Sequence, residues 1–431
     1  MTTENKMVFP QEIYDLIVDE VAAQDYRFRD LRACAKASRV LLYPAYRHLF
    51  SHIRLTIMRG NVIDTKVPEF VSLLRSSLRS PDISIAFYIR TAEFYVTPKI
   101  TYTVHVLTEL WKVLYSFTRL EHLKVSSRDF LISFETHRCF LSQDFIDLCH
   151  SPTLSKLTLS NFVDAPAHLL RNSHISHIEL SNVTFAPYLS ERTFIHQPES
   201  IDVDVESFHS IINALHGGGL MDRSSRWREA FGRLRTLDIR PYGVVDLPDC
   251  LNVAAAASAT LEILSIHIKA EFEIGPSSGD LKYIFHPFSN LRVLRIFFSH
   301  LSFWHPAESC FIDQLTSLLS LSTLPRSLQS LDIGANTSIT LDSNYGIECD
   351  CRPSKRTDYW RRLDSVLADP RIAGVPSLRL FLVFFVFTRT DQRELASRTR
   401  KGIKEVLPVF CQTRLLSLTG QRSVVCNSFH I

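Results

Sequence analysis

The feature that most constrains this chain is a short aliphatic pattern, Leu-x-x-Leu-x-Leu, that recurs along most of its length. Its clearest copies begin at Leu120, Leu154, Ile175, Leu234, Leu261, Leu291 and Leu328, and weaker copies lie at 201–205 and 378–384. Alternating apolar positions predict one β-strand per copy, with one face of each strand buried in a shared core. Such a chain grows by stacking strands, so its 431 residues do not require several compact cores.

Two of the copies are nearly duplicates. Residues 154–166 read LSKLTLSNFVDAP and residues 175–187 read ISHIELSNVTFAP. Asn161, Asn182 and Asn336 come at or near the ends of their expected strands, where a side-chain amide can satisfy backbone groups as the chain turns. Together the pattern and the asparagines resemble a leucine-rich repeat, although the spacing is less regular than the ~20–29 residues of uniform repeats.

Helical candidates lie between the expected strands. Four apolar stripes at helical spacing fall within 106–117, 208–215 after the possible cap Ser207, 311–319, and 359–367 after the possible cap Asp358. Strand–helix alternation predicts an α/β fold: an irregular leucine-rich-repeat solenoid with a curved parallel sheet and helices on the convex side. The alternative is two ordinary α/β domains.

The first fifty residues have a different pattern, which predicts three short helices. The first covers about 9–22, with Ile13, Leu16, Ile17 and Val21 on one face. Asp30 is placed to cap a second helix, and Pro44 lies near the expected start of a third. So short a unit cannot bury all its apolar surface alone, so it must pack against the repeats, a partner, or both.

Within this segment, Phe9-Pro10-Gln11-Glu12-Ile13, the run Cys34–Arg39 and the run Arg47–Phe50 resemble the F-box of fungal proteins. The resemblance covers residues 7–57 and implies an F-box-like helical domain, leaving 58–431 as the repeat domain. It implies docking on a Skp-type adaptor, and through it on a cullin–RING (SCF-type) ubiquitin ligase. The implied adaptor-binding residues are Phe9, Pro10, Ile13, Leu16, Ile17, Leu31, Cys34 and Ser38. The alternative is that these helices only cap the repeats.

Polar residues between the repeated leucines are the candidates for binding a protein target. They are Lys124, Lys156, Thr158, Glu179, Asp238, Ser265, Arg295 and Asp332. Because their neighbours along each strand are apolar, we expect these side chains to face outward. The sequence as a whole therefore suggests a substrate receptor of a ubiquitin ligase, with an unidentified protein target. A leucine-rich-repeat scaffold with no ligase link is the alternative.

Motifs for chemistry are weak. The cluster Gly217-Gly218-Gly219 lacks the Lys-Ser/Thr continuation of a phosphate loop, and His174 and His177 have no further ligands at metal-site spacing. We therefore predict no enzyme, no catalytic residues, no metal and no cofactor. The net charge of only +3 makes nucleic acid an improbable partner, with the basic stretch 352–362 as the one segment that keeps that alternative open.

The compartment follows from cysteine usage and apolar runs. Nine cysteines are scattered along the chain, an odd count that does not suggest a disulfide framework. The most apolar run, 378–387, is far shorter than the ~20 residues that span a bilayer. With no signal-like segment at the start, we expect a cytoplasmic or nuclear protein without a membrane partner.

Overall fold

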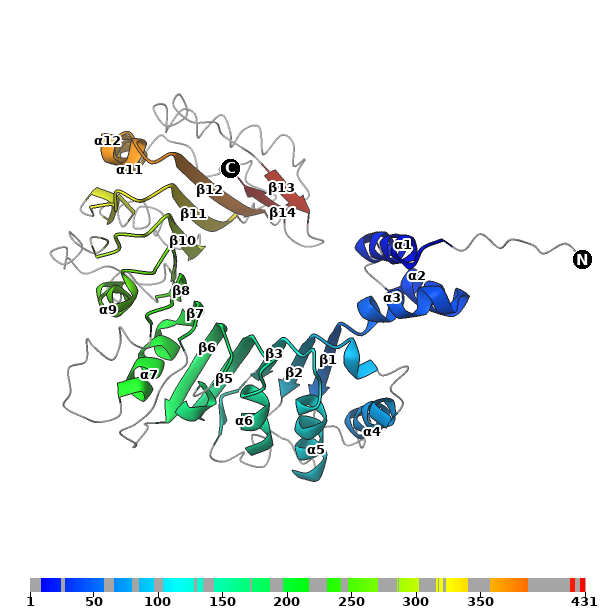
Figure 1. Ribbon diagram of the computed structural model, residues 1–431. Coiled ribbons are helices and arrows are strands. Elements are labelled where there is room, and N and C mark those ends of the chain that lie inside the picture. Colours follow the sequence, from blue (N-terminus) through cyan, green and yellow to red (C-terminus); the bar gives the residue numbers. More distant parts are fainter. Residues whose placement is uncertain are drawn as a thin grey trace, which may run out of the picture. The chain divides into compact units, whose positions relative to one another are not determined.

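The computed structural model divides the chain into two compact units (Figure 1). Unit 1 comprises Met1–His196 and Ser210–Gly219, and unit 2 comprises Gln197–His209 and Leu220–Ile431. The structure describes residues 9–24, 28–57, 66–79, 85–96, 104–127, 130–134, 143–170, 173–186, 197–216, 231–241, 247–269, 285, 287–301, 315–316, 318–320, 323–339, 357–386, 419–422 and 427–430.

Unit 1 begins with the three predicted helices, α1 (Gln11–Gln24), α2 (Arg29–Ala37) and α3 (Arg39–Leu49). They share a small core in which Val18, Leu31 and Ala45 are at most 1% exposed. Two predicted helix starts are wrong. Asp30 lies inside the first turn of α2, because the residue before the helix is Phe28. The third helix starts well before Pro44, because the Ser38 hydroxyl accepts a hydrogen bond from Val40 N and caps α3.

Pro44 lies within α3, where its ring nitrogen cannot donate to the carbonyl four residues back. That carbonyl belongs to Val40, and the side-chain amide of Gln11 donates to it at 3.2 Å. A side chain of α1 thus provides the bond that proline removes from α3. Since an unpaired backbone carbonyl is costly, this contact also fixes how α1 lies on α3.

The sheet of unit 1 is parallel and follows chain order. Its strands are β1 (His52–Ile57), β2 (Thr91–Val96), β3 (His122–Ser127), β5 (Lys156–Pro166) and β6 (His177–Ala186), and the short β4 (Ile132–Ser133) pairs with β5. Helices α4 (Lys66–Arg79), α5 (Val104–Tyr115) and α6 (Gln143–Cys149) lie on one side of it (Figure 1). The short 3-10 helices η2 (Ile85–Phe87) and η3 (Ala167–Leu170) complete the connections.

Unit 2 repeats this arrangement. Its parallel strands in chain order are β7 (Ser200–Asp204), β8 (Thr236–Arg240), β9 (Ile263–Lys269), β10 (Val293–Leu301), β11 (Ser330–Ile339) and β12 (Ser377–Val386). Beyond β12 the sheet continues antiparallel through β14 (Asn427–His430) and β13 (Thr419–Arg422), an ending that the repeat pattern did not predict. Its described helical segments include α9 (Leu247–Ala254), η5 (Ala255–Ala257), α11 (Thr357–Leu367) and α12 (Pro370–Ala373).

Helix α7 (Val205–His216) crosses the division between the units and begins earlier than predicted. Its first turn is capped by Asp204, whose Oδ1 accepts from Ser207 N at 2.8 Å, so Ser207 is not the cap. Likewise α11 begins at Thr357, so Asp358 is helical and does not precede the helix. Most of the helix predicted within 311–319 lies outside the described residues.

The repeated aliphatic residues occupy the same face of every described parallel strand. In unit 1, Leu123 lies in register with Ala92 and Leu157, and in unit 2, Leu294 lies in register with Leu264 and Leu331. All six are fully buried, each large one contributing roughly 1.5–3 kcal/mol. The predicted stripe of α5 lies against this face, where the buried Trp111 packs edge-on against Phe94 of β2 and Phe145 of α6.

A second regularity fixes the register of the strands. Just before a strand, one carbonyl accepts the N–H groups of two consecutive residues of the next repeat. Ser51 O accepts from Arg90 N and Thr91 N, and Arg90 O accepts from Glu121 N and His122 N. In unit 2 the carbonyls of Glu199, Arg235, Glu262 and Arg292 do the same. Because a one-residue slip would break both bonds and turn the leucines outward, each repeat is held to its neighbour.

Sequential parallel strands with intervening helices make each unit an α/β repeat fold, which confirms the leucine-rich-repeat type of organisation. Two ordinary doubly wound domains would need a strand order that departs from chain order, which the described strands do not have. The curvature of the sheet and the domain boundary near residue 57 stay predictions.

Candidate functional site

The surface of α1 carries apolar side chains that the protein itself does not cover. Phe9 is 56% exposed, Ile13 41%, Leu16 64% and Ile17 49%. The spacing of Ile13, Leu16 and Ile17 places them on one side of α1, and Phe9 lies just before the helix. The spacing grouped Val21 with Ile13, Leu16 and Ile17, but Val21 packs inward while the other three are exposed. The inner side is formed by Val18, with Val21 and Ala22 packed beside it, because α2 and α3 lie against that side.

The other F-box-like residues differ in position. Pro10 is exposed just before α1, and its carbonyl accepts from Ile13 N. Leu31 is buried, Cys34 packs against the same small core, and Ser38 caps α3. Leu31 therefore cannot supply a surface contact, and Cys34 and Ser38 act mainly by positioning the helices. The exposed set is Phe9, Pro10, Ile13, Leu16 and Ile17, which we call the α1 face.

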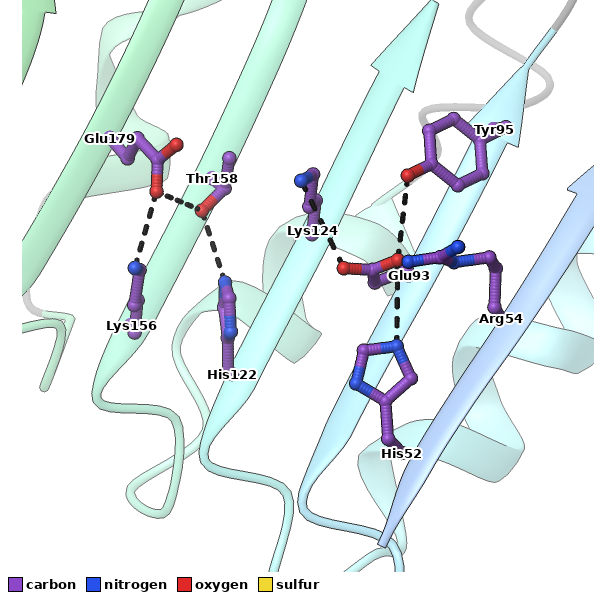
Figure 2. Close-up of polar contacts among 9 residues, drawn as sticks. All are labelled: His52, Arg54, Glu93, Tyr95, His122, Lys124, Lys156, Thr158 and Glu179. Carbon is purple, nitrogen blue, oxygen red and sulfur yellow. Dashed lines mark hydrogen bonds and ion pairs between the residues drawn. The ribbon is translucent and has the colours of Figure 1, made fainter. Parts of the chain in front are cut away.

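A second candidate surface lies on the sheet of unit 1, opposite the leucines (Figure 2). Parallel register places its side chains in two rows. The first row is Arg54, Glu93, Lys124, Thr158 and Glu179, and the second is His52, Thr91, His122, Lys156 and His177. All four target-binding candidates predicted for this part of the chain therefore come together. We call these two rows the unit 1 polar face.

Glu93 is the centre of one half of this face. Its carboxylate accepts from Arg54 Nε at 2.7 Å, lies 3.4 Å from His52 Nε2, and is 3.9 Å from Lys124 Nζ (Figure 2). Burial would raise the pKa of Glu93, but the hydrogen bond from Arg54 and the charges of His52 and Lys124 outweigh burial and lower it. The carboxylate is therefore ionised and holds two cations from the neighbouring strands in place.

The other half is a chain of contacts across β3, β5 and β6. Thr158 Oγ1 donates to Glu179 at 3.2 Å, and His122 Nε2 lies 3.0 Å from the same hydroxyl (Figure 2). Lys156 Nζ is 3.2 Å from Glu179. Because an ionised carboxylate can only accept, the single hydroxyl proton of Thr158 goes to Glu179 and His122 must donate through Nε2.

The pKa values of this group support that assignment. Burial, helped by the positive charge of Lys156, lowers the pKa of His122 to about 4. The imidazole is therefore neutral near pH 7, with its proton on Nε2. For Glu179, burial raises the pKa, but the hydrogen bond and charge of Lys156 outweigh it and lower it. The arrangement is a set of fixed polar groups suited to recognition, since the Thr158 hydroxyl is a donor to Glu179 and is not activated by His122.

Unit 2 has an equivalent row, which we call the unit 2 polar row. It contains Asp202, Asp238, Ser265, Arg295, Asp332 and Arg379 in register on β7 to β12. Arg240 binds Asp202 through both carboxylate oxygens, and His267 Nε2 lies 3.2 Å from Asp238. Arg379 binds Asp332 through two 2.7 Å contacts, and Arg295 approaches the same carboxylate at 3.5 Å.

Three predicted surface residues do not face solvent. Thr158, Ser265 and Asp332 are only 2–3% exposed, although they lie on the polar side of their strands. Their side chains are short, and longer side chains on neighbouring strands contact Thr158 and Asp332 from both sides. The expectation that the whole row faces outward is therefore wrong at these positions.

The sequence patterns missed several members of these surfaces. Glu93, Arg54 and His52 lie on β1 and β2, which lack the leucine repeat, and Arg240, His267 and Arg379 are unit 2 counterparts. The available signal was the two-residue alternation in HIRLTI and TAEFYV.

Other predictions concern metals and nucleic acid. Within the described ranges, no three His, Cys, Asp or Glu side chains are grouped closely enough to hold a metal ion. His174 and His177 are exposed at the start of β6. Residues 352–356 of the basic stretch 352–362, and all of Gly217–Gly219, lie outside what the structure describes, whereas 357–362 belong to α11. None of the described helices has the length and apolar character needed to cross a lipid bilayer.

Comparison with known proteins adds the following. No family model matches the sequence, and no curated protein matches it. Among solved structures, the chain is similar to the leucine-rich repeat-containing protein LegL7 from Legionella pneumophila, with 12% identity and a TM-score of 0.38. The match covers 83% of this chain and 98% of that chain. The assignment of the fold rests on the strand order and register of this chain.

Proposed function

We propose that this chain is a protein-interaction receptor that docks on a Skp-type adaptor, and through it on a cullin, by way of the α1 face. The polar faces of the strands then bind a protein target. The observation that carries the proposal is the exposure of Ile13, Leu16 and Ile17 on a helix whose opposite side already packs against α2 and α3, with Phe9 exposed just before that helix.

The physical argument concerns apolar surface. A helix needs only one apolar side to pack on its own domain, so a second apolar side costs solubility and is retained where it binds something. Transfer of each large side chain from water to a partner contributes roughly 1.5–3 kcal/mol when burial is complete. Three such residues on one helix, with Phe9 just before it, suffice for specific docking of the helix-in-groove type.

The resemblance to the F-box supplies the identity of the partner. Phe9, Pro10 and Ile13 belong to the segment that carries the resemblance, and they are also exposed. Leu31, Cys34 and Ser38 then support the α1 face indirectly, through the shared core and the cap of α3. This agreement between sequence motif and exposure favours adaptor docking over a purely capping role.

The test is capture of the full chain by a purified Skp-type adaptor. We expect the wild-type chain to bind and Leu16→Asp to lose binding by at least tenfold, because a charge would be placed within an apolar contact. Leu73→Asp is the matched control, since Leu73 is also about half exposed but lies on α4. Both variants should keep the wild-type circular dichroism and melting temperature.

Two results would count against the proposal. If the wild-type chain is not captured, the ligase link is excluded and the scaffold alternative remains, in which the polar faces bind partners without a ligase. If Leu16→Asp binds as well as wild type, any adaptor contact lies elsewhere than on the α1 face.

A further inference from the structure

The unit 2 polar row contains one cation that is only weakly paired. The side chain of Asp332 is 4% exposed, and Arg379 occupies both of its oxygens at 2.7 Å. The Ser330 hydroxyl also donates to Asp332. Arg295 reaches the carboxylate only through Nε, at 3.5 Å, and its side chain is 41% exposed. Among the described contacts, the terminal nitrogens of Arg295 form no hydrogen bond with Asp332.

The two arginines beside Asp332 are not paired with it equally. Arg379 occupies both carboxylate oxygens, so Arg295 keeps only the longer contact. On the other side of Arg295 the row continues with the neutral Ser265. The next carboxylate, Asp238, lies beside His267, and Asp202 is held by Arg240. The described neighbours of Arg295 therefore leave its charge incompletely compensated.

An aromatic surface adjoins this charge. Phe297 lies two residues further along β10 on the same side as Arg295, and its ring stacks on His267 at 5.0 Å. On the other flank it covers Gly334 of β11, where a Cβ atom would overlap the ring. The ring is thus held between two strands and is partly exposed. A guanidinium and a fixed ring, side by side, can receive an anionic and an apolar side chain from one peptide.

We propose that Arg295 and Phe297 form a binding site for an acidic peptide segment, with an Asp or Glu carboxylate on Arg295 and a neighbouring apolar side chain on Phe297. A carboxylate fits better than a phosphate because a single negative charge matches that of Arg295, whereas a dianion would be repelled by the buried Asp332. This inference rests on the target-binding half of the proposed function and does not involve the α1 face.

The experiment probes the full-length chain against an array of synthetic hexapeptides of random composition, with matched Glu, Gln and phosphoserine series. We expect enrichment of peptides in which Asp or Glu lies within two positions of an apolar residue. Arg295→Gln should reduce that enrichment roughly tenfold, because a charge-assisted contact is lost. Arg295→Lys should retain part of it, and the exposed Arg292, outside the row, supplies the control Arg292→Gln.

The inference is overturned if Arg295→Gln selects the same peptides as wild type, or if phosphoserine peptides exceed the Glu series. It is also overturned if the wild-type chain shows no acidic preference. Adaptor capture is measured on the same preparations. Loss of peptide selection with intact capture separates this site from the adaptor-docking proposal, and the reverse result leaves the peptide site standing without the ligase link.

Discussion

At the scale of single residues, Asn161 explains how β5 accommodates a left-handed backbone conformation without glycine. Its backbone has φ of 64°, a left-handed conformation that asparagine tolerates better than most residues. Its amide donates to Ser127 O at 2.6 Å, and its own carbonyl accepts from Asn182 Nδ2 at 3.0 Å. Asn182 also has positive φ, at 56°. The two asparagines therefore link three neighbouring strands of the sheet. This confirms that the Asn161 amide satisfies a backbone carbonyl, but the predicted position at the strand ends is wrong, because both asparagines lie within β5 and β6.

Replacement of Asn161 should separate the contribution of its side-chain hydrogen bonds from that of its left-handed backbone conformation. Asn161→Ala loses both side-chain hydrogen bonds and puts alanine, which tolerates positive φ less well than asparagine, at this position. We therefore expect a loss of about 2–3 kcal/mol in the free energy of unfolding. Asn161→Gly loses the same bonds without the backbone strain, and should be about 1 kcal/mol more stable than the alanine variant. Urea unfolding measures both, and equal stability of the two variants would show that the backbone conformation contributes nothing.

His122 should make stability depend on pH. Its pKa in the folded protein is about 4, below the 6.5 of an unperturbed histidine, so between these values the unfolded chain binds a proton that the folded chain does not. Protonation therefore favours unfolding, and His122 lowers stability as pH falls from about 6.5 to 4. In His122→Gln, which can still donate to Thr158, the loss of unfolding free energy between pH 7 and pH 5 should be smaller than in wild type. Urea titrations at the two pH values give this difference, and His209→Gln controls for the removal of a histidine elsewhere.

The side of the sheet on which a residue lies was predicted correctly from the apolar–polar alternation. The exposure of its side chain was not, because exposure depends on the residues of adjacent strands. The alternation correctly placed Lys124, Thr158 and Glu179 on one side of the sheet. Thr158 is buried because longer side chains lie on both sides of it, on the neighbouring strands. The sequence pattern does not say which segments of the chain form those strands. Pairing partners of this kind require the register, which the sequence pattern alone does not supply.

At the scale of elements, the two polar surfaces share one design. A buried carboxylate on a middle strand holds cations from both neighbouring strands: Glu93 on β2 holds Arg54 and Lys124, and Asp332 on β11 holds Arg295 and Arg379. The carboxylate is shielded while the cations are partly exposed. The two kinds of substitution should therefore differ in their effect on stability. Removing a cation leaves a buried carboxylate without its partner, whereas removing the carboxylate leaves cations that water can solvate.

Substitutions at Asp332 and Arg379 test that difference. We expect Arg379→Met to lower the unfolding free energy by about 2–3 kcal/mol, since Asp332 keeps only the longer contact with Arg295. Asp332→Asn should cost less, about 1 kcal/mol, because both arginines are half exposed. Chemical denaturation of the two variants and of the double variant measures the coupling. A larger loss from Asp332→Asn than from Arg379→Met would contradict the proposed shielding.

The elements were largely predictable, but helical spacing alone did not separate the two apolar sides of α1. Helical spacing correctly indicated three helices before the repeats, and the leucine pattern indicated β3, β5, β6 and most strands of unit 2. Helix α1, however, is apolar on two sides: Ile13, Leu16 and Ile17 on one, Val18 and Val21 on the other. Periodicity cannot decide which side is buried, because that depends on where α2 and α3 pack. The antiparallel ending β14–β13 was missed because its sequence lacks the repeat.

At the scale of the whole molecule, stability should be distributed locally. Each described parallel strand pairs only with strands next to it in the sheet, and each connecting carbonyl bonds the adjacent repeat. In a repeat protein of this kind, stability is a sum of contributions from each repeat and from its contacts with adjacent repeats. A destabilising substitution should therefore affect mainly its own repeat and the adjacent ones.

Phe298 of β10 provides a test, since its side chain is fully buried between β9 and β11. Phe298→Ala should cost about 3–5 kcal/mol locally, because it removes a large core side chain and leaves a cavity. Backbone amides of β9, β10 and β11 should then exchange with solvent hydrogen much faster, while those of β1, β2 and β3 in unit 1 keep their wild-type protection. Hydrogen exchange followed by mass spectrometry resolves the two groups of strands. If exchange accelerated equally in β9–β11 and in β1–β3, the whole chain would unfold as one cooperative unit. The nearest-neighbour description would then be wrong.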